Sequence, residues 1–259
     1  MEIITDQLGR SVQFNHPLRI VSLVPSQSEL LVYLGLEKQL VGVTKFCVFP
    51  ESLLKEKVVV GGTKKVHIAK IRELKPDIIL CNKEENTQEI VSACEAIAPT
   101  HISDVKNLEE AYEMMTQYGT IFNKTDKVKR LIEQLKLKEN QLKQHNSSLP
   151  SKKVAYVIWR NPWMVAGHNT FISFLMELMK FKNMFSNLES RYPVIQLHDL
   201  QDADLILLSS EPFPFKKEHI TELRKYTNAE IVLVDGTYYS WYGSRLLQSF
   251  DYFMQQHFS

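Results

Sequence analysis

The sequence predicts an α/β protein whose two parallel-sheet lobes are joined by one long helix. Three observations predict this class. Short β-branched runs alternate with helical patterns up to residue 105, and the same alternation returns after residue 153. Between these regions, residues 125–145 contain neither Gly nor Pro, which indicates an unbroken helix. Strands that alternate with helices favour parallel sheets.

The N-terminal region begins with a buried strand and a hydroxyl-rich turn. The strand Ile20–Val24 runs into Pro25, Ser26 and Ser28, and the helical pattern that follows ends at Gly35. Such a turn leaves free backbone N–H groups at the carboxyl end of a sheet, where open α/β folds hold ligands. Further strands are predicted at Leu40–Val43, Val58–Val60, Ile78–Cys81 and His101–Ile102, and helices at Glu29–Leu34, Ile68–Leu74 and Thr87–Ile97.

A helical region follows. Asn107 is predicted to cap a helix over Leu108–Ile121, and a second helix runs from Thr125 to His145 before residues 146–151 break it. One face of the second helix is apolar, and Lys and Glu cover the other. Its apolar residues are Val128, Leu131, Ile132, Leu135 and Leu142. About twenty residues at a rise of 1.5 Å extend roughly 30 Å, the diameter of a small domain.

The remainder of the chain repeats the α/β pattern. Strands are predicted at Val154–Trp159, Leu205–Leu208 and Ile231–Val234, and helices at Phe171–Met179, Lys217–Tyr226 and Ser244–Gln256. Both halves contain an Asp that opens an apolar strand after a helix, at Asp77 and Asp204. We therefore predict an N-terminal α/β lobe over residues 1–106, a connecting helical region over 107–150 and a C-terminal α/β lobe over 151–259.

Composition limits the partners and the cellular location that we expect. Because 31 basic and 30 acidic side chains give a formal net charge of +1, we expect no nucleic-acid or acidic-membrane partner. No apolar run approaches the roughly 18 residues that span a bilayer, so no membrane insertion is expected. The N-terminus lacks the features of a secretory leader. The sequence as given therefore predicts a cytoplasmic protein, or one of the cell envelope or periplasm if a leader has been trimmed. Cys47, Cys81 and Cys94 have the spacing of neither a disulfide framework nor a zinc site.

Aromatic side chains gather after predicted strands, where packing does not require them. Residues 236–243 form a predicted loop that holds Tyr238, Tyr239, Trp241 and Tyr242. Residues 159–167 hold two tryptophans after another strand, and Phe46 and Phe49 follow a third. These groups converge on carboxyl ends of strands, the ligand edge of open sheets. They predict an aromatic-lined ligand cleft between the lobes; the alternative is packing between lobes and capping of strand ends.

Two arginines lie at positions where their positive charge calls for a negatively charged partner. Arg160 follows a strand and could clamp a ligand carboxylate or phosphate, because a guanidinium offers a planar fork. A salt bridge at the lobe interface is the alternative. Arg245 lies at the start of the last helix, where a cation is unfavourable unless an anion is near. We expect Arg245 to be exposed.

The histidines do not form a metal signature. His67, His101, His168 and His198 lack i,i+4 spacing and a matching Cys or Asp pattern, so most are expected at the surface or at polar interfaces. One imidazole could still supply an axial ligand to cobalt or iron. His168, which follows the aromatic segment, is the first candidate and His67 the second.

Several segments, in this order, carry a family resemblance: residues 19–36, 41–50, the pair Gly61-Gly62 and residues 74–80. They resemble the substrate-binding proteins of ABC importers for cobalamin, iron–siderophores and haem (the helical-backbone metal receptors), closest to the cobalamin-binding branch. The resemblance implies two Rossmann-like lobes joined by a stiff helix, with the ligand cleft between the lobes.

The resemblance also implies site residues. Phe46, Trp163, Met164, Tyr238 and Tyr239 match residues of the cobalamin cleft. Thr63 and Asn82 stand where the cobalamin binder has tryptophans, and Ser240 replaces an acidic residue. Family members dock on their permease through one glutamate per lobe; the matching positions lie near Ala69 and Leu197, with Glu73 and Asp199 close by.

These observations predict a non-catalytic, monomeric binder of a corrinoid or other metal chelate. It needs no cofactor, and its ligand is cobalamin or another cobalt or iron complex. It is either the substrate-binding component of an ABC-type uptake system, with a permease as partner, or a leaderless cytosolic relative. The predicted ligand contacts are Phe46, Thr63, Asn82, Arg160, Trp163, Met164, Tyr238, Tyr239 and Trp241. The alternative is a cytosolic metal-handling enzyme or cofactor chaperone on the same fold, with His168, His67 or Asp235 as its ionisable group.

Overall fold

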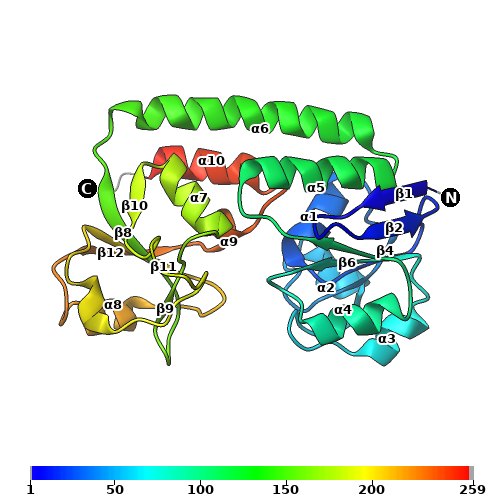
Figure 1. Ribbon diagram of the computed structural model, residues 1–259, viewed down its shortest axis with the longest axis horizontal. Coiled ribbons are helices and arrows are strands. Elements are labelled where there is room, and N and C mark those ends of the chain that lie inside the picture. Colours follow the sequence, from blue (N-terminus) through cyan, green and yellow to red (C-terminus); the bar gives the residue numbers. More distant parts are fainter. Residues whose placement is uncertain (1, 257–259) are drawn as a thin grey trace. The chain divides into compact units, whose positions relative to one another are not determined.

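The computed structural model describes residues 2–256, and its contacts divide the chain into two compact units (Figure 1). Unit 1 contains the chain up to Gln134 together with Trp241–Arg245. Unit 2 contains Leu135–Ser240 and the chain from Leu246 onward.

Unit 1 is built on a parallel sheet of strand order β5-β4-β3-β6-β7. Its strands are β3 (Ile20–Ser22), β4 (Leu40–Val43), β5 (Val58–Val59), β6 (Ile78–Asn82) and β7 (Thr100–Ser103). Its helices are α1 (Pro25–Tyr33), α2 (Ser52–Glu56), α3 (Ile68–Glu73), α4 (Gln88–Glu95) and α5 (Leu108–Ile121). Every residue of β3 and β6 is buried, as in parallel sheets that helices cover on both faces. An antiparallel hairpin, β1 (Glu2–Thr5) and β2 (Ser11–Phe14), forms a separate small sheet.

Unit 2 repeats this plan with the strand order β10-β8-β11-β12. Its strands are β8 (Lys152–Trp159), β10 (Phe181–Asn183), β11 (Leu205–Ser209) and β12 (Glu230–Val234), all parallel, with the short β9 (Met164–Val165) antiparallel to β8. Its α-helices are α7 (Phe171–Leu178), α8 (Lys217–Leu223), α9 (Thr237–Ser240) and α10 (Leu246–Gln255), and 3₁₀ turns lie at η1 (Asn146–Ser148) and η2 (Leu197–Leu200). One core cluster lies on β8 and β11 and includes Ala155, Val157, Ile206 and Leu208.

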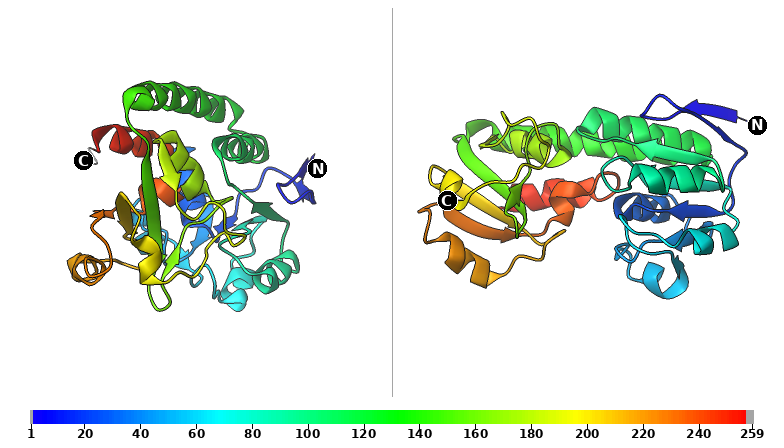
Figure 2. Two further views of the ribbon diagram at one scale, coloured as in Figure 1. Left: turned by 60° about the vertical axis from the view of Figure 1, so that its left-hand side comes forward. Right: turned by 60° about the horizontal axis from the view of Figure 1, so that its bottom comes forward.

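Helix α6 (Thr125–His145) is continuous in sequence and structure (Figure 2). Its residues up to Gln134 belong to unit 1, and those from Leu135 belong to unit 2. The turn that precedes it needs Asn123 at a positive φ of 53°. Gly119 lets α5 approach the start of α6, because a Cβ there would lie 3.2 Å from the Cα of Thr125. Within residues 2–256, no helix combines the length and the hydrophobicity of a bilayer-spanning segment.

The predicted α/β class with two parallel-sheet units is confirmed. The bounds of β4, α5 and α6 match the prediction, and the other predicted strands and helices are found with shifted ends. Three features differ. The β1–β2 hairpin was not predicted, the predicted loop at 236–243 contains the helical turn α9, and Trp241–Arg245 belong to unit 1 rather than to the C-terminal lobe.

Candidate functional site

Each sheet has a point where the strand order reverses. In unit 1, the chain proceeds from β3 outward through β4 and β5, then returns to β6 beside β3 and continues to β7. In unit 2 the same reversal falls between β8 and β11. Connections leave such a point in opposite directions, which opens a crevice at the carboxyl ends of the two strands. A ligand site is therefore expected at these edges.

The reversal point of unit 1 is filled by a buried hydrogen-bond network. Gln27 Nε2, at the start of α1, donates to Ser103 Oγ at 2.6 Å, and Tyr118 OH donates to Gln27 Oε1 at 2.8 Å. Asn82 Nδ2 donates to Ser103 Oγ at 3.0 Å, and Tyr242 OH lies 3.5 Å from the same oxygen. All five side chains are buried. Buried polar groups that satisfy one another in this way fix a single arrangement of the strand ends.

Asn82 and Thr63, both predicted ligand contacts, belong to this buried layer. Asn82 is only 3% exposed, and its Oδ1 accepts the backbone N–H groups of Glu84 and Glu85 at 2.8 and 3.1 Å. The carbonyl of Thr63, 9% exposed, accepts from Asn86 Nδ2 at 3.0 Å. Both residues therefore shape the loops of this edge, and a direct ligand contact stays a prediction.

Phe46 is the exposed aromatic ring of this edge. It follows β4 and is 49% exposed, which leaves much of an apolar ring in water. The ring lies against Gly62, where an added Cβ would come 3.2 Å from Phe46 Cε2. Lys45 Nζ lies 5.0 Å from the ring centroid. Gly62 thus leaves room for the Phe46 ring, and a side chain at residue 62 would displace that ring.

The segment Trp241–Arg245 packs on unit 1 through Arg245. Its guanidinium makes a two-point ion pair with Glu29 on α1, with Nε–Oε2 at 3.0 Å and Nη2–Oε1 at 2.7 Å. Its Cζ also lies 4.1 Å from the ring centroid of Phe49 and 5.4 Å from that of Trp241. Burial raises the pKa of Glu29, and the nearby Arg245 offsets part of that rise. The expectation of an exposed Arg245 is wrong, because Glu29 supplies the anion.

Trp241, a predicted ligand contact, is 5% exposed and meets Phe49 edge-on at 5.8 Å. Its ring is thus largely committed to packing inside unit 1. Contact with a ligand stays a prediction for this residue.

The reversal point of unit 2 carries an aromatic cluster of Trp159, Trp163, Phe213 and Phe215. Trp159, at the end of β8, is 39% exposed and meets Phe213 edge-on at 5.8 Å. Trp163 stacks on Phe215 at 5.8 Å, and Phe213 and Phe215 lie 4.7 Å apart. Phe215 is buried, whereas Trp163 and Phe213 are half-buried. The cluster therefore presents apolar ring surface at the carboxyl edge of the sheet.

Sequence reasoning missed Phe213 and Phe215. The sequence contained a signal: residues 212–215 read Pro-Phe-Pro-Phe, separated by three residues from the predicted strand at 205–208. The two prolines, which alternate with the rings, end the strand and disfavour a helix, so Phe213 and Phe215 are expected near the end of the strand.

Arg160 and Met164 lie beside this cluster. Arg160 pairs with Glu222 of α8, with Nε–Oε2 at 3.1 Å and Nη2–Oε1 at 3.3 Å, and its Cζ lies 5.8 Å from the Trp163 ring. The pair lies within unit 2 and is about one-third exposed, so it stabilises little by itself. Met164 is half-buried on β9 and pairs with Trp159.

Helix α9 places the tyrosine pair of unit 2 in two environments. Tyr238 is half-buried and stacks on Tyr252 at 4.5 Å. Tyr239 is fully buried against Tyr156 and Phe253, at 5.0 and 4.9 Å. Burial raises the pKa of Tyr239, and its hydroxyl has no hydrogen-bond partner among the described residues. A ligand contact by either tyrosine stays a prediction.

The helical turn itself is specified by a local contact of Asp235 and by tertiary contacts of Ser240 and Gly236. Asp235 Oδ1 accepts the backbone N–H of Thr237 at 3.0 Å and its hydroxyl at 2.8 Å. Ser240 Oγ donates to Glu211 Oε1 at 2.7 Å. Gly236 fits against β11, because a Cβ there would lie 2.3 Å from Ser209 Oγ. The expected open loop is therefore wrong, and three of its four aromatic side chains, Tyr239, Trp241 and Tyr242, are buried.

No metal centre forms among the described residues, where no three His, Cys, Asp or Glu side chains gather to hold an ion. His168 is half-buried, and its Nδ1 is buried without a partner in residues 2–256. His67 and His198 are exposed. His101 is fully buried, and its Nε2 lies 2.6 Å from Gln117 Oε1.

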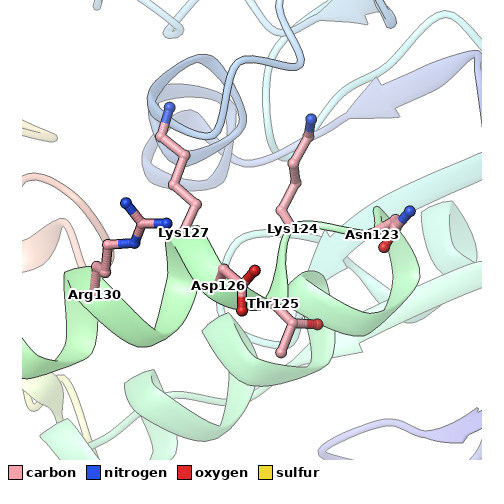
Figure 3. Close-up of a pocket in the computed structure, with 6 residues that line it drawn as sticks. All are labelled: Asn123, Lys124, Thr125, Asp126, Lys127 and Arg130. Atoms are coloured by element: carbon pink, nitrogen blue, oxygen red, sulfur yellow. The ribbon is translucent and has the colours of Figure 1, made fainter.

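A hollow of about 250 Å³ lies at the turn between α5 and α6 of unit 1 (Figure 3). It is lined by Asn123, Lys124, Thr125, Asp126, Lys127 and Arg130. None of the predicted ligand contacts lines it. Its walls are charged and flexible side chains, which suit solvent or a small ion better than a large apolar ligand.

Comparisons with known proteins identify the family. Residues 20–231 match the sequence pattern of the periplasmic binding proteins. The chain is 28% identical over 176 residues to an uncharacterized ABC transporter substrate-binding lipoprotein, YvrC, of Bacillus subtilis, covering 64% of this chain and 55% of that protein. It is 25% identical over 176 residues to a vitamin B12-binding protein of Yersinia pestis, covering 68% and 62%. The matches thus span less than two thirds of the length of these curated relatives.

Solved structures confirm the fold. The vitamin B12-binding protein BtuF of Vibrio cholerae superposes with a TM-score of 0.78 at 18% identity, covering 92% of this chain and 96% of that one. The petrobactin-binding protein YclQ of Bacillus subtilis gives 0.80 at 18% identity, covering 99% of both chains. A haem-binding protein of Pseudomonas aeruginosa gives 0.79 at 21%, covering 92% and 91%. The predicted family resemblance is confirmed: this chain belongs to the periplasmic binding protein family.

Proposed function

We propose that the chain is the substrate-binding component of an ABC-type uptake system and binds a bulky metal chelate of the cobalamin, haem or ferric-siderophore class without chemically changing it. One observation carries this proposal. Exposed or half-buried aromatic rings occupy the carboxyl edge of both sheets: Phe46 in unit 1, and Trp159, Trp163 and Phe213 in unit 2. Exposing apolar ring surface to water is unfavourable, so covering these rings with an apolar ligand lowers the free energy.

The relatives support the ligand class. Proteins of this fold are described as binders of vitamin B12, haem and petrobactin. All three are large ligands with extended apolar or planar surface. Covering about 100 Å² of ring surface would contribute roughly 2.5 kcal/mol.

The predicted contacts then fall into two roles. We propose that Phe46, Arg160, Trp163, Met164 and Tyr238 touch the ligand, since all are exposed or half-buried. The buried residues Thr63, Asn82, Tyr239 and Trp241 would hold the loops that carry them. His168 remains the first candidate for an axial ligand to the metal.

A permease is the proposed partner, which places the chain at the cell envelope. The acids nearest to the family's docking positions are both exposed. Glu73 ends α3, whereas Asp199 also accepts the backbone N–H of Gln196 at 2.8 Å and lies 3.2 Å from His198. We propose Glu73 as the docking acid of unit 1.

Titration tests the proposal. Hydroxocobalamin, haemin and a ferric catecholate siderophore would each be added to the purified chain, with visible absorbance and tryptophan fluorescence as readouts. We expect one of them to bind with a micromolar or smaller dissociation constant and Phe46→Ala to weaken it about tenfold, near 1.4 kcal/mol. Tyr226→Ala is the matched control, because Tyr226 is also an exposed ring, at 48%, but lies between α8 and β12, before the amino end of that strand. Failure of all three chelates to bind, or equal losses in both variants, would reject the proposal.

A further inference from the structure

Five residues of the late chain complete unit 1. The segment Trp241–Arg245 lies between α9 and α10, which both belong to unit 2, yet its own contacts are with unit 1. Gly243 adopts φ +99° and packs on α1, since a Cβ there would lie 3.4 Å from Leu30 Cβ. Tyr242 joins the buried network through Gln27, 3.4 Å away. The segment is thus built into unit 1 by shape and by polar contacts.

Arg245 is the ionic side chain of this segment, and it is buried. It is 5% exposed, and the side chain of its partner Glu29 is 15% exposed. A buried ion pair gains little net stability over an apolar packing of the same volume, because both charges lose their hydration. The pair does fix the relative positions of the groups that it joins. A guanidinium can donate two hydrogen bonds to a carboxylate and stack on an aromatic ring at the same time, which an ammonium cannot do.

The ring under Arg245 belongs to the loop that presents Phe46. Phe49 lies three residues beyond Phe46, and Val48 N donates to the Phe46 carbonyl at 2.9 Å. The other side of the loop is tied to α1 through Cys47, whose Sγ lies 3.1 Å from Ser28 Oγ. Glu29 is the next residue of α1. The loop is therefore held at Cys47 by α1 and at Phe49 by Arg245, which pairs with α1.

We propose that Arg245 is a positioning residue for ligand binding: through Glu29 and Phe49 it fixes the loop 44–50 and so the placement of the Phe46 ring. This inference rests on the proposed function. It predicts that Arg245 contributes to affinity without touching the ligand, and only while Phe46 is present.

The test compares Arg245→Lys with Arg10→Lys. Arg10 is the matched control, because it also pairs with a buried acid of unit 1, Asp6 at 2.7 Å, but contacts neither α1 nor the loop. Backbone amide exchange of residues 45–48 is measured without ligand. Arg245→Lys is expected to raise it about tenfold relative to the rest of unit 1, whereas Arg10→Lys leaves it unchanged. Equal exchange in the two variants would overturn the proposal.

The second readout is affinity for whichever of hydroxocobalamin, haemin or the ferric siderophore the wild-type chain binds. Arg245→Lys is expected to weaken binding about tenfold, and to have no further effect in a Phe46→Ala background. An equal loss in both backgrounds would show that Arg245 acts elsewhere. If the wild type binds none of these probes, the proposed function fails, while the exchange measurement still decides whether Arg245 fixes the loop. If Arg245→Lys does not fold, Phe49→Leu removes the stacked ring, keeps the ion pair and is expected to loosen residues 45–48 in the same way.

Discussion

His101 is a polar residue sealed inside unit 1. Its ring is fully buried, with Nε2 against Gln117 Oε1 and Tyr118 edge-on at 5.2 Å. Burial is the largest cause that lowers its pKa below the usual 6.5, and the hydrogen bond to Gln117 offsets only part of it. The folded protein therefore holds the neutral imidazole, although the sequence alone suggested a surface or interface position.

This burial predicts a pH-dependent stability. Because the folded pKa lies below the unfolded one, the unfolded chain takes up the proton first as the pH falls below about 6.5. The contribution of His101 to the free energy of unfolding is therefore full above that pH and decreases below it. The decrease is at most about 1.4 kcal/mol per pH unit for one proton, and it stops once the pH is below the folded pKa. Urea unfolding at pH 7.5 and 5.5 measures the loss, which should shrink in His101→Gln. The same pH dependence in both proteins would show that other groups cause it.

At the scale of elements, Gly236 determines where the tyrosines of α9 lie. Gly236 has Ser209 and Glu211 so close that an added Cβ would lie 2.3 and 2.6 Å from their side chains. The absence of a side chain lets β12 turn directly into α9, which sends Tyr239 into the core of unit 2.

Gly236→Ala should therefore destabilise the protein by about 1–3 kcal/mol through overpacking. Gly9→Ala is the comparison, because Gly9 has φ +75° but nothing within 4 Å of its would-be Cβ. That change should cost only about 1 kcal/mol, for the backbone alone. Chemical denaturation measures both, and a smaller loss for Gly236→Ala than for Gly9→Ala would contradict the packing explanation.

Elements with local signals could be predicted from the sequence. Helix α5 has a capping Asn107, whose side chain accepts from Glu110 N at 2.8 Å, and α6 has a sustained apolar face. The β1–β2 hairpin escaped notice because β1 is short and mostly exposed. Helix α9 was missed because two of its contacts come from Ser209 and Glu211, which are distant in sequence.

The candidate site was predictable only in part. Phe46 and Trp163 stand out as aromatics after strands, a signal that sequence carries. The pairing of Trp163 with Phe215 needs β8 and β11 to be neighbours, which the chain order does not state. Arg245 finds its anion 216 residues away, so no local pattern could reveal that it is buried.

At the scale of the whole molecule, two units repeat one plan. Each has a parallel sheet whose strand order reverses, and each places aromatic rings beside the carboxyl ends of its strands. The chain passes from one unit to the other after Gln134, after Ser240 and again after Arg245. Family membership and the fold are established by the comparisons, and the physical question left is which surface holds a ligand.

Amide hydrogen exchange of the wild-type protein, with and without the chelate that it binds, tests this most directly. The carboxyl edges of the two sheets should be protected by the ligand, at residues 45–48 in unit 1 and 210–215 in unit 2, by about tenfold or more. The turn at residues 123–130 should exchange at an unchanged rate. Protection confined to that turn, or none at either edge while the chelate is bound, would contradict the account.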